Sequence, residues 1–122
     1  MMTDVLITGA DTITGYNTGR AIQDPSICLW GMASRKDAWE CRSNLWSELF
    51  IIETGAEPLL DKLLQIGADY QTKHGYDKKI ILFPSQDYVV EAISIHRQDI
   101  SRYYNFVLPE HEAVERLLDK TL

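Results

Sequence analysis

The sequence predicts a three-layer α/β/α domain built on a mostly parallel sheet of four to five strands. Short apolar, β-rich runs alternate with amphipathic helical segments along the whole chain, and strands separated by helices are joined by right-handed crossovers in such domains. The run at residues 27–32 is apolar throughout, which is typical of a strand buried on both faces. The chain has 122 residues, the usual size of one domain, so residues 1–122 are expected to form a single unit.

The expected strands are short runs rich in β-branched and other apolar side chains. In chain order they are residues 5–8, 27–32, 49–52, 79–83 and 105–108. Four other segments repeat their apolar residues at helical spacing: residues 14–22, 57–64, 89–93 and 113–118. The segment 37–48 carries the weakest pattern and is expected to be a short helix on the surface.

The charge balance and the absence of special segments exclude several function classes. The net charge is −6 and the lysines and arginines are scattered, whereas a nucleic-acid partner requires a clustered cationic surface. No apolar run approaches the length of a membrane span, and the N-terminus lacks the pattern of a signal peptide, so a cytoplasmic protein is expected. The cysteines and the isolated histidines have no metal-ligand spacing, and no metal site is expected.

Three loops are expected at the carboxyl edge of the sheet, where open parallel sheets bind their ligands. They span residues 9–15, 33–36 and 84–87. If the first and fourth strands are neighbours, the first and third of these loops meet at the point where the strand order reverses.

The first loop, residues 8–15 (TGADTITG), is close to a nucleotide-binding fingerprint. Thr12 occupies the position of the middle glycine, through which a pyrophosphate would approach the backbone, and Asp11 would repel a phosphate. The sequence leaves open a tight turn in which Thr14 caps the following helix and a site for a small ligand. A dinucleotide site is the least favoured of the three.

The second and third loops each allow a structural and a functional interpretation. Arg35 and Lys36 follow the second strand, where they would suit a 2′-phosphate or be two ordinary solvated charges. No Tyr-x-x-x-Lys pair occurs in the chain, which argues against short-chain reductase chemistry. Ser85 and Asp87 either cap the next helix or contact a substrate.

The second half of the chain resembles the N-terminal, pre-ATP-grasp domain of ATP-grasp carboxylate–amine ligases, in the carbamoyl-phosphate synthase-like and D-aspartate ligase-like branch. The resemblance rests on four motifs in order: residues 82–91 (LFPSQDYVVE), 96–104 (HRQDISRYY), 107–109 (VLP) and 117–120 (LLDK). Two positions depart from the pattern: Gln86 replaces a frequent serine, and residues 109–111 (PEH) replace a more usual Pro-Ser-Pro.

This resemblance implies a Rossmann-like fold and a role in a longer enzyme. Such an enzyme uses ATP and Mg²⁺ to convert a carboxylate into an acyl phosphate, which an amine then attacks. The catalytic ATP-grasp module, which would bind most of the ATP and Mg²⁺, is expected after residue 122. The 122 residues alone are therefore expected to be inactive, and a homo-oligomer remains compatible with the sequence.

The same resemblance implies which residues face the substrates, a small carboxylate and an amine. Asp11, Thr12, Ser85 and Asp87 would contact substrate, and Lys120 would reach a phosphate of the nucleotide. No catalytic and no metal-binding residue is expected within the chain. Two alternatives stay open: an NAD(P)-binding domain that uses the first loop and Arg35, and a non-catalytic sensing or interaction domain.

Overall fold

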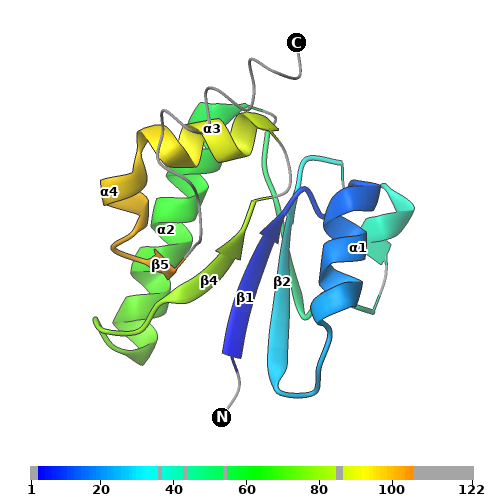
Figure 1. The fold of residues 1–122 in the computed structure, drawn as a ribbon, viewed down its shortest axis with the longest axis horizontal. Helices are drawn as coiled ribbons and strands as arrows, with labels where there is room; N and C mark the ends of the chain where they lie inside the picture. Colours follow the sequence, from blue (N-terminus) through cyan, green and yellow to red (C-terminus); the bar gives the residue numbers. More distant parts are fainter. Residues whose placement is uncertain (1–2, 36, 43, 54, 85–86, 106–122) are drawn as a thin grey trace.

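The computed structural model describes residues 3–35, 37–42, 44–53, 55–84 and 87–105, and Figure 1 shows their arrangement. Strands and helices alternate, as the spacing of the apolar residues predicts. In chain order the elements are β1 (Thr3–Thr8), α1 (Ile13–Ile22), β2 (Ile27–Ala33), the 3₁₀ helix η1 (Trp39–Arg42), β3 (Glu48–Ile51), α2 (Ala56–His74), β4 (Ile80–Phe83), α3 (Asp87–Ile95), α4 (Arg97–Ile100) and β5 (Tyr104–Asn105).

The described strands form one sheet in which every neighbouring pair is parallel. Their order is β3-β2-β1-β4-β5, with β1 paired to β2 on one side and to β4 on the other. α1 and η1 cover one face of the sheet, and α2, α3 and α4 cover the other (Figure 1). The predicted three-layer α/β/α architecture with a parallel sheet is confirmed, and its strand order is Rossmann-like.

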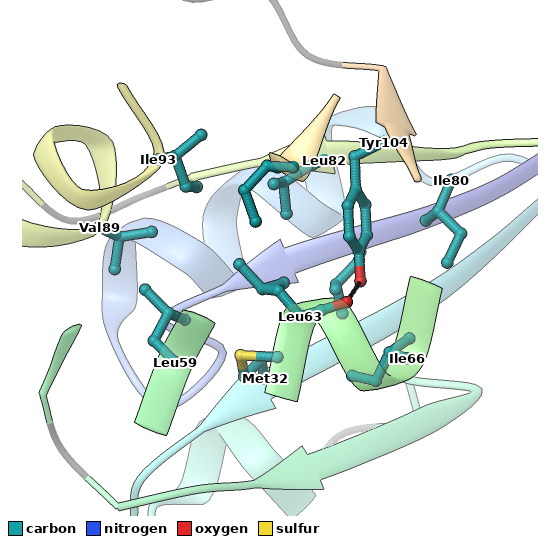
Figure 2. Packing of buried hydrophobic residues seen from close by; sticks show 11 residues of the cluster. Met32, Leu59, Leu63, Ile66, Ile80, Leu82, Val89, Ile93 and Tyr104 are labelled. Atoms are coloured by element: carbon teal, nitrogen blue, oxygen red, sulfur yellow. Dashed lines mark hydrogen bonds between the residues drawn. The ribbon is translucent and has the colours of Figure 1, made fainter. Parts of the chain in front are cut away.

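The larger hydrophobic core lies between the sheet and the helices α2 and α3 (Figure 2). Leu59, Leu63 and Ile66 of α2 recur three and four residues apart, so they lie on one face of the helix. Their exposed fractions are 1%, 0% and 6%. Apolar side chains from the strands and α3 pack against them: Leu6, Met32, Ile80, Leu82, Val89 and Ile93.

Tyr104 of β5 fastens the edge of the sheet to α2. Its side chain is buried, and its hydroxyl donates a hydrogen bond of 2.7 Å to the carbonyl oxygen of Leu63 (Figure 2). Burial raises the pKa of this hydroxyl far above its ordinary value, because an ionised phenolate would lose its hydration. The neutral hydroxyl therefore acts as a donor inside the core.

The smaller core lies under α1 on the opposite face. Successive residues of a strand point to opposite faces, so Val5 and Ile7 of β1 face α1 while Leu6 faces α2. The buried positions of α1 are Gly15 and Gly19, which allow the helix to lie very close to the sheet. Trp46 packs beside Gly19, with 9% of its surface exposed.

Two segments differ from the sequence-based expectations. The segment 37–48 contains a short helix, as expected, but it is the four-residue 3₁₀ helix η1, and Trp46 of the same segment is buried in a core instead of lying on the surface. The short helix α4 was not expected; it buries Ile100 completely. Most of the expected strand at residues 105–108 and the whole expected helix at 113–118 lie outside the described residues.

Within the described part of the chain, no helix has both the length and the apolarity needed to cross a bilayer.

Candidate functional site

The candidate site lies at the carboxyl edge of the sheet, beside β1. β1 is the first strand in the sequence and lies between β2 and β4, so the chain order reverses at the β1–β4 pair. In open parallel sheets, ligands bind outside the carboxyl ends of the strands at such a reversal. The register pairs Ile7 with Phe83 at these ends, which brings the segments after β1 and β4 to the same edge.

Two glycines give the loop after β1 its shape. Gly9 has a φ of 69°, a left-handed conformation that glycine adopts without strain. A Cβ on Gly15 would lie 2.1 Å from the carbonyl oxygen of Gly9, so no other residue fits without moving the helix. These are the roles of the first and third glycines in the nucleotide-binding fingerprint, and the loop resembles it in backbone shape at both positions.

Thr12, at the middle position, closes the loop. Its hydroxyl donates to the Gly9 carbonyl oxygen at 2.7 Å and accepts from the Gly15 amide at 3.1 Å. Thr12 is therefore the N-cap of α1, and the expectation that Thr14 caps this helix is wrong. Because helix α1 begins one residue earlier than expected, Thr14 lies inside its first turn. The capping hydroxyl satisfies one of the amides that a phosphate would otherwise approach.

Asp11 connects the loop after β1 to the loop after β2. Only 3% of the residue is exposed. Its Oδ2 accepts hydrogen bonds from the Ser34 amide and hydroxyl, each 3.3 Å long, and from the Arg35 amide at 3.0 Å. These donors compensate the cost of burying the carboxylate. Asp11 therefore holds two loops together, and its Oδ2 is occupied by the protein itself.

The side chain of Arg35 also binds Asp11, from the solvent side. Its Nε lies 3.4 Å from Asp11 Oδ2, and its Nη2 donates to the Asp11 carbonyl oxygen at 2.8 Å. The side chain of Arg35 is nevertheless 69% exposed, compared with 5% for Asp11. The buried member of this ion pair is the acid, and the member that faces solvent is the base.

A narrow hollow separates these loops from the two helices behind them. Its volume is about 10 Å³, which is room for about one water molecule. The lining residues include Thr8, Gly9, Asp11, Ser34, Ile52 and Val89. A pyrophosphate does not fit into this hollow without a change in the loop.

The structure describes some of the predicted site residues fully and others only in part or not at all. Asp11 and Thr12 are adjacent in the first loop, as expected, but both use side-chain atoms for internal hydrogen bonds. Asp87 is the first residue of α3, at the neighbouring position on the carboxyl edge, and its side chain is outside the described residues. Ser85 and Lys120 also lie outside them, so their expected roles stay predictions.

The hydrogen bonds between Asp11 and the loop after β2 were not expected from the sequence. Arg35 and Lys36 were identified there only as a possible phosphate site or as two solvated charges, and Ser34 was given no role. The signal that points to them is topological: β1 and β2 are parallel neighbours, so the residues that follow them meet at one edge. A buried acid after one strand can then bond the amides after the other.

The fold and the site together define a Rossmann-like α/β domain whose first loop is closed and whose carboxyl edge carries an anchored arginine. No known protein-family model matches the chain, and a search of curated proteins returned no significant match. In the part of the chain that the structure describes, no three His, Cys, Asp or Glu residues are grouped so that they could hold a metal ion.

Proposed function

We propose that this domain forms the substrate-side wall of an ATP-dependent carboxylate–amine ligase. In that reaction a carboxylate oxygen attacks the γ-phosphorus of ATP, ADP leaves, and an acyl phosphate forms. The nitrogen of an amine then attacks the acyl carbon, and inorganic phosphate leaves as the amide bond forms. The Mg²⁺ and most of the ATP would be bound by a catalytic module that follows residue 122, so the 122 residues alone would not turn over.

One observation carries the proposal that a further module covers the carboxyl edge. Six large apolar side chains are exposed among the described residues, and four of them belong to segments at or just beyond the carboxyl ends of strands: Ile13, Trp39, Ile51 and Phe83. Trp39 stacks edge-to-face on Tyr16 in the second turn of α1, with ring centroids 5.1 Å apart, which places it near the same edge. Several exposed apolar side chains near one edge of a domain support the proposal that another domain covers this edge.

The sequence motifs supply the chemical class of that module. The segments at residues 82–91 and 96–104, which resemble the pre-ATP-grasp pattern, include the end of β4, the start of α3 and the helix α4. β4 thus ends at the strand-order reversal, where a substrate-side domain would contact its ligand.

An NAD(P)-binding domain is the alternative that one observation favours, because Arg35 follows β2 where a 2′-phosphate would lie. The first loop opposes it. Thr12 occupies the middle glycine position and caps α1, and the adjacent hollow has a volume of only about 10 Å³. The other alternative, a non-catalytic sensing or interaction domain, would require neither ATP nor a carboxylate substrate.

The test is to express these 122 residues together with whatever the reading frame encodes after Leu122. The protein is incubated with ATP, Mg²⁺, hydroxylamine and a panel of carboxylic and amino acids. Hydroxylamine traps an acyl phosphate as a hydroxamate, so the amine substrate need not be known. We expect ATP-dependent hydroxamate with at least one carboxylate, release of ADP, and no product from the 122 residues alone.

Two outcomes would contradict the proposal. The first is the absence of hydroxamate and of carboxylate-stimulated ADP release across the panel. The second is saturable binding of NADPH by the 122-residue chain with a Kd of micromolar order that is lost in Arg35→Gln, which would favour the dinucleotide alternative. A variant with a substitution far from the edge, Tyr76→Phe, serves as the control for general damage, because Tyr76 is 84% exposed.

A further inference from the structure

Arg35 is a cation that the fold holds in place without covering it. Asp11, from the neighbouring loop, binds its Nε and Nη2, yet 69% of the Arg35 side chain remains exposed. A guanidinium has five N–H donors. Among the described residues, the two contacts to Asp11 are the only hydrogen bonds of the Arg35 guanidinium, so its other N–H groups have no protein partner there.

The anchor itself is rigid because Asp11 is buried and multiply bonded. The amides of Ser34 and Arg35 and the Ser34 hydroxyl all donate to Asp11 Oδ2. The carboxylate therefore holds the backbone of Arg35, and its Oδ2 together with the Asp11 carbonyl oxygen orients the side chain. A long side chain that is already ordered loses less conformational entropy when it binds a ligand.

The exposed side of Arg35 faces an open depression between the ends of β2 and β3. The depression has a volume of about 700 Å³ and is lined by Ser34, Arg35, Asp37, Ala38 and Ile51. We call it the Arg35 depression. Its polar lining includes one donor-rich cation, Arg35, and one carboxylate, Asp37, while Ala38 and Ile51 provide an apolar wall.

We propose that the Arg35 depression is a binding site for an oxyanion, a carboxylate or a phosphoryl group. Arg35 contacts the ligand, and Asp11 is the positioning residue that orients the guanidinium. The planar guanidinium can donate two parallel hydrogen bonds to such a group. The identification of this oxyanion as part of a ligase substrate rests on the proposed function, whereas the binding of an oxyanion does not.

This assignment changes the role expected for Asp11. The sequence suggested that Asp11 contacts substrate, but a buried carboxylate at an oxyanion site would repel the ligand. Arg35 lies between Asp11 and the solvent, and its charge offsets that of Asp11. Asp11 therefore acts by orienting Arg35, and the ligand contacts the Arg35 guanidinium and not the Asp11 carboxylate.

The test is an NMR titration of the 122-residue chain at constant ionic strength, in two arms. One arm uses inorganic phosphate and the other uses acetate, with the Arg35 Nε–H and the Asp37 and Ala38 amides as reporters. We expect saturable shifts with a Kd of millimolar order. Saturation by phosphate alone indicates a phosphoryl ligand, saturation by acetate alone indicates a carboxylate ligand, and both support the site.

Matched variants separate a specific site from a general charge effect. Arg35→Gln should abolish saturation at the backbone reporters, and Arg35→Lys should weaken binding about tenfold because it loses the two-pronged donor. Asp37→Asn should tighten binding about two- to fivefold, the scale of an exposed charge interaction. Arg20→Gln, which removes another exposed arginine that lies over the Tyr16 ring, should leave the affinity within about twofold.

The proposal is overturned if neither anion saturates any reporter, or if the saturable shifts persist in Arg35→Gln. Asp11→Asn tests the positioning role separately: it should weaken binding while Arg35 is still present, and unchanged affinity would refute that role. A negative titration leaves the hydroxamate test unaffected, and a negative hydroxamate test leaves the titration unaffected, so the two failures are distinguishable.

Discussion

Asp11 and Thr12 are neighbours in one loop, and each uses its side chain for different hydrogen bonds within the protein. Asp11 binds the loop after β2 through its carboxylate, and Thr12 binds both ends of its own turn through its hydroxyl. Both sets of hydrogen bonds satisfy backbone groups that would otherwise have no partner at a buried edge. The loop after β1 is therefore held from two directions, and Asp11 links it to Arg35 of the next loop, whose side chain faces solvent.

Thr12→Ala is expected to lower the free energy of unfolding by about 1 kcal/mol, the usual contribution of an N-cap hydroxyl. The Gly15 amide loses its acceptor and the Gly9 carbonyl oxygen loses one donor. Thr12→Ser keeps the hydroxyl and should recover most of the loss. Urea denaturation of the two variants measures the difference.

Thr14→Ala is the matched control, because Thr14 is the cap that the sequence suggested and it lies exposed in the first turn of α1. It should change the unfolding free energy by less than about 0.5 kcal/mol. A loss in Thr14→Ala as large as that in Thr12→Ala would contradict the assignment of the cap.

At the scale of elements, α1 packs directly on its neighbours without intervening side chains because Gly15 and Gly19 form its buried face. Gly15 lies against the backbone of the loop after β1, and a Cβ there would meet the Gly9 carbonyl carbon at 2.7 Å as well as its oxygen. A flexible side chain can move away from such a contact, but a backbone carbonyl that shapes a turn cannot move alone. The position of α1 therefore also fixes the first loop of the site.

Gly15→Ala tests this packing because two effects of opposite sign compete. Alanine favours a helix over glycine by about 1 kcal/mol, whereas overpacking against a rigid neighbour costs about 1–3 kcal/mol. Since the clash is with backbone, we expect a net loss of stability in thermal and urea unfolding. Asn17→Ala, on the exposed face of the same helix, should be neutral or stabilising, and a stable Gly15→Ala would contradict the close approach.

At the scale of the whole molecule, one hydrogen bond joins segments that are 66 residues apart. The Tyr70 hydroxyl of α2 donates to Asp4 Oδ2 of β1 at 2.7 Å. Burial, and then the hydrogen bond and negative charge of Asp4, raise the pKa of Tyr70 from 10.0 to about 12. This contact joins α2 to the amino-terminal end of the central strand, far from the candidate site.

The raised pKa predicts how stability depends on pH. The unfolded chain releases the Tyr70 proton near its ordinary pKa, and the folded chain retains it to about pH 12. The contribution of Tyr70 is therefore fully present below about pH 10 and is lost as the pH rises through the folded pKa. We expect the free energy of unfolding, measured by urea denaturation, to fall over this alkaline window.

Tyr70→Phe should make that fall shallower, because the variant has no proton to lose at this position. Buried Tyr104 contributes in the same direction, so the difference between variant and parent isolates the effect of Tyr70. Tyr76→Phe, which removes an exposed hydroxyl at the end of α2, is the control and should follow the parent curve. Superimposable curves for Tyr70→Phe and the parent would contradict the prediction.

The class of fold followed from local patterns that the sequence carries in full. The spacing of Leu59 and Leu63 predicted the buried face of α2, and the continuous apolar run after Ile27 predicted the buried strand β2. Both features depend on short-range periodicity, which burial on one or two faces imposes directly. The position of the first loop at the carboxyl edge followed from the same alternation of strands and helices.

Only the tertiary structure decided which groups in that loop bind each other. The N-cap falls on Thr12 because the left-handed turn at Gly9 brings its hydroxyl to the Gly15 amide. Trp46 is buried because Gly19 of α1 and Gly31 of β2 leave space beside it. Asp11 reaches Arg35 because β2 pairs with β1. Each of these contacts joins residues whose distance depends on strand pairing or helix docking, and these are properties of the assembled sheet that no local pattern encodes.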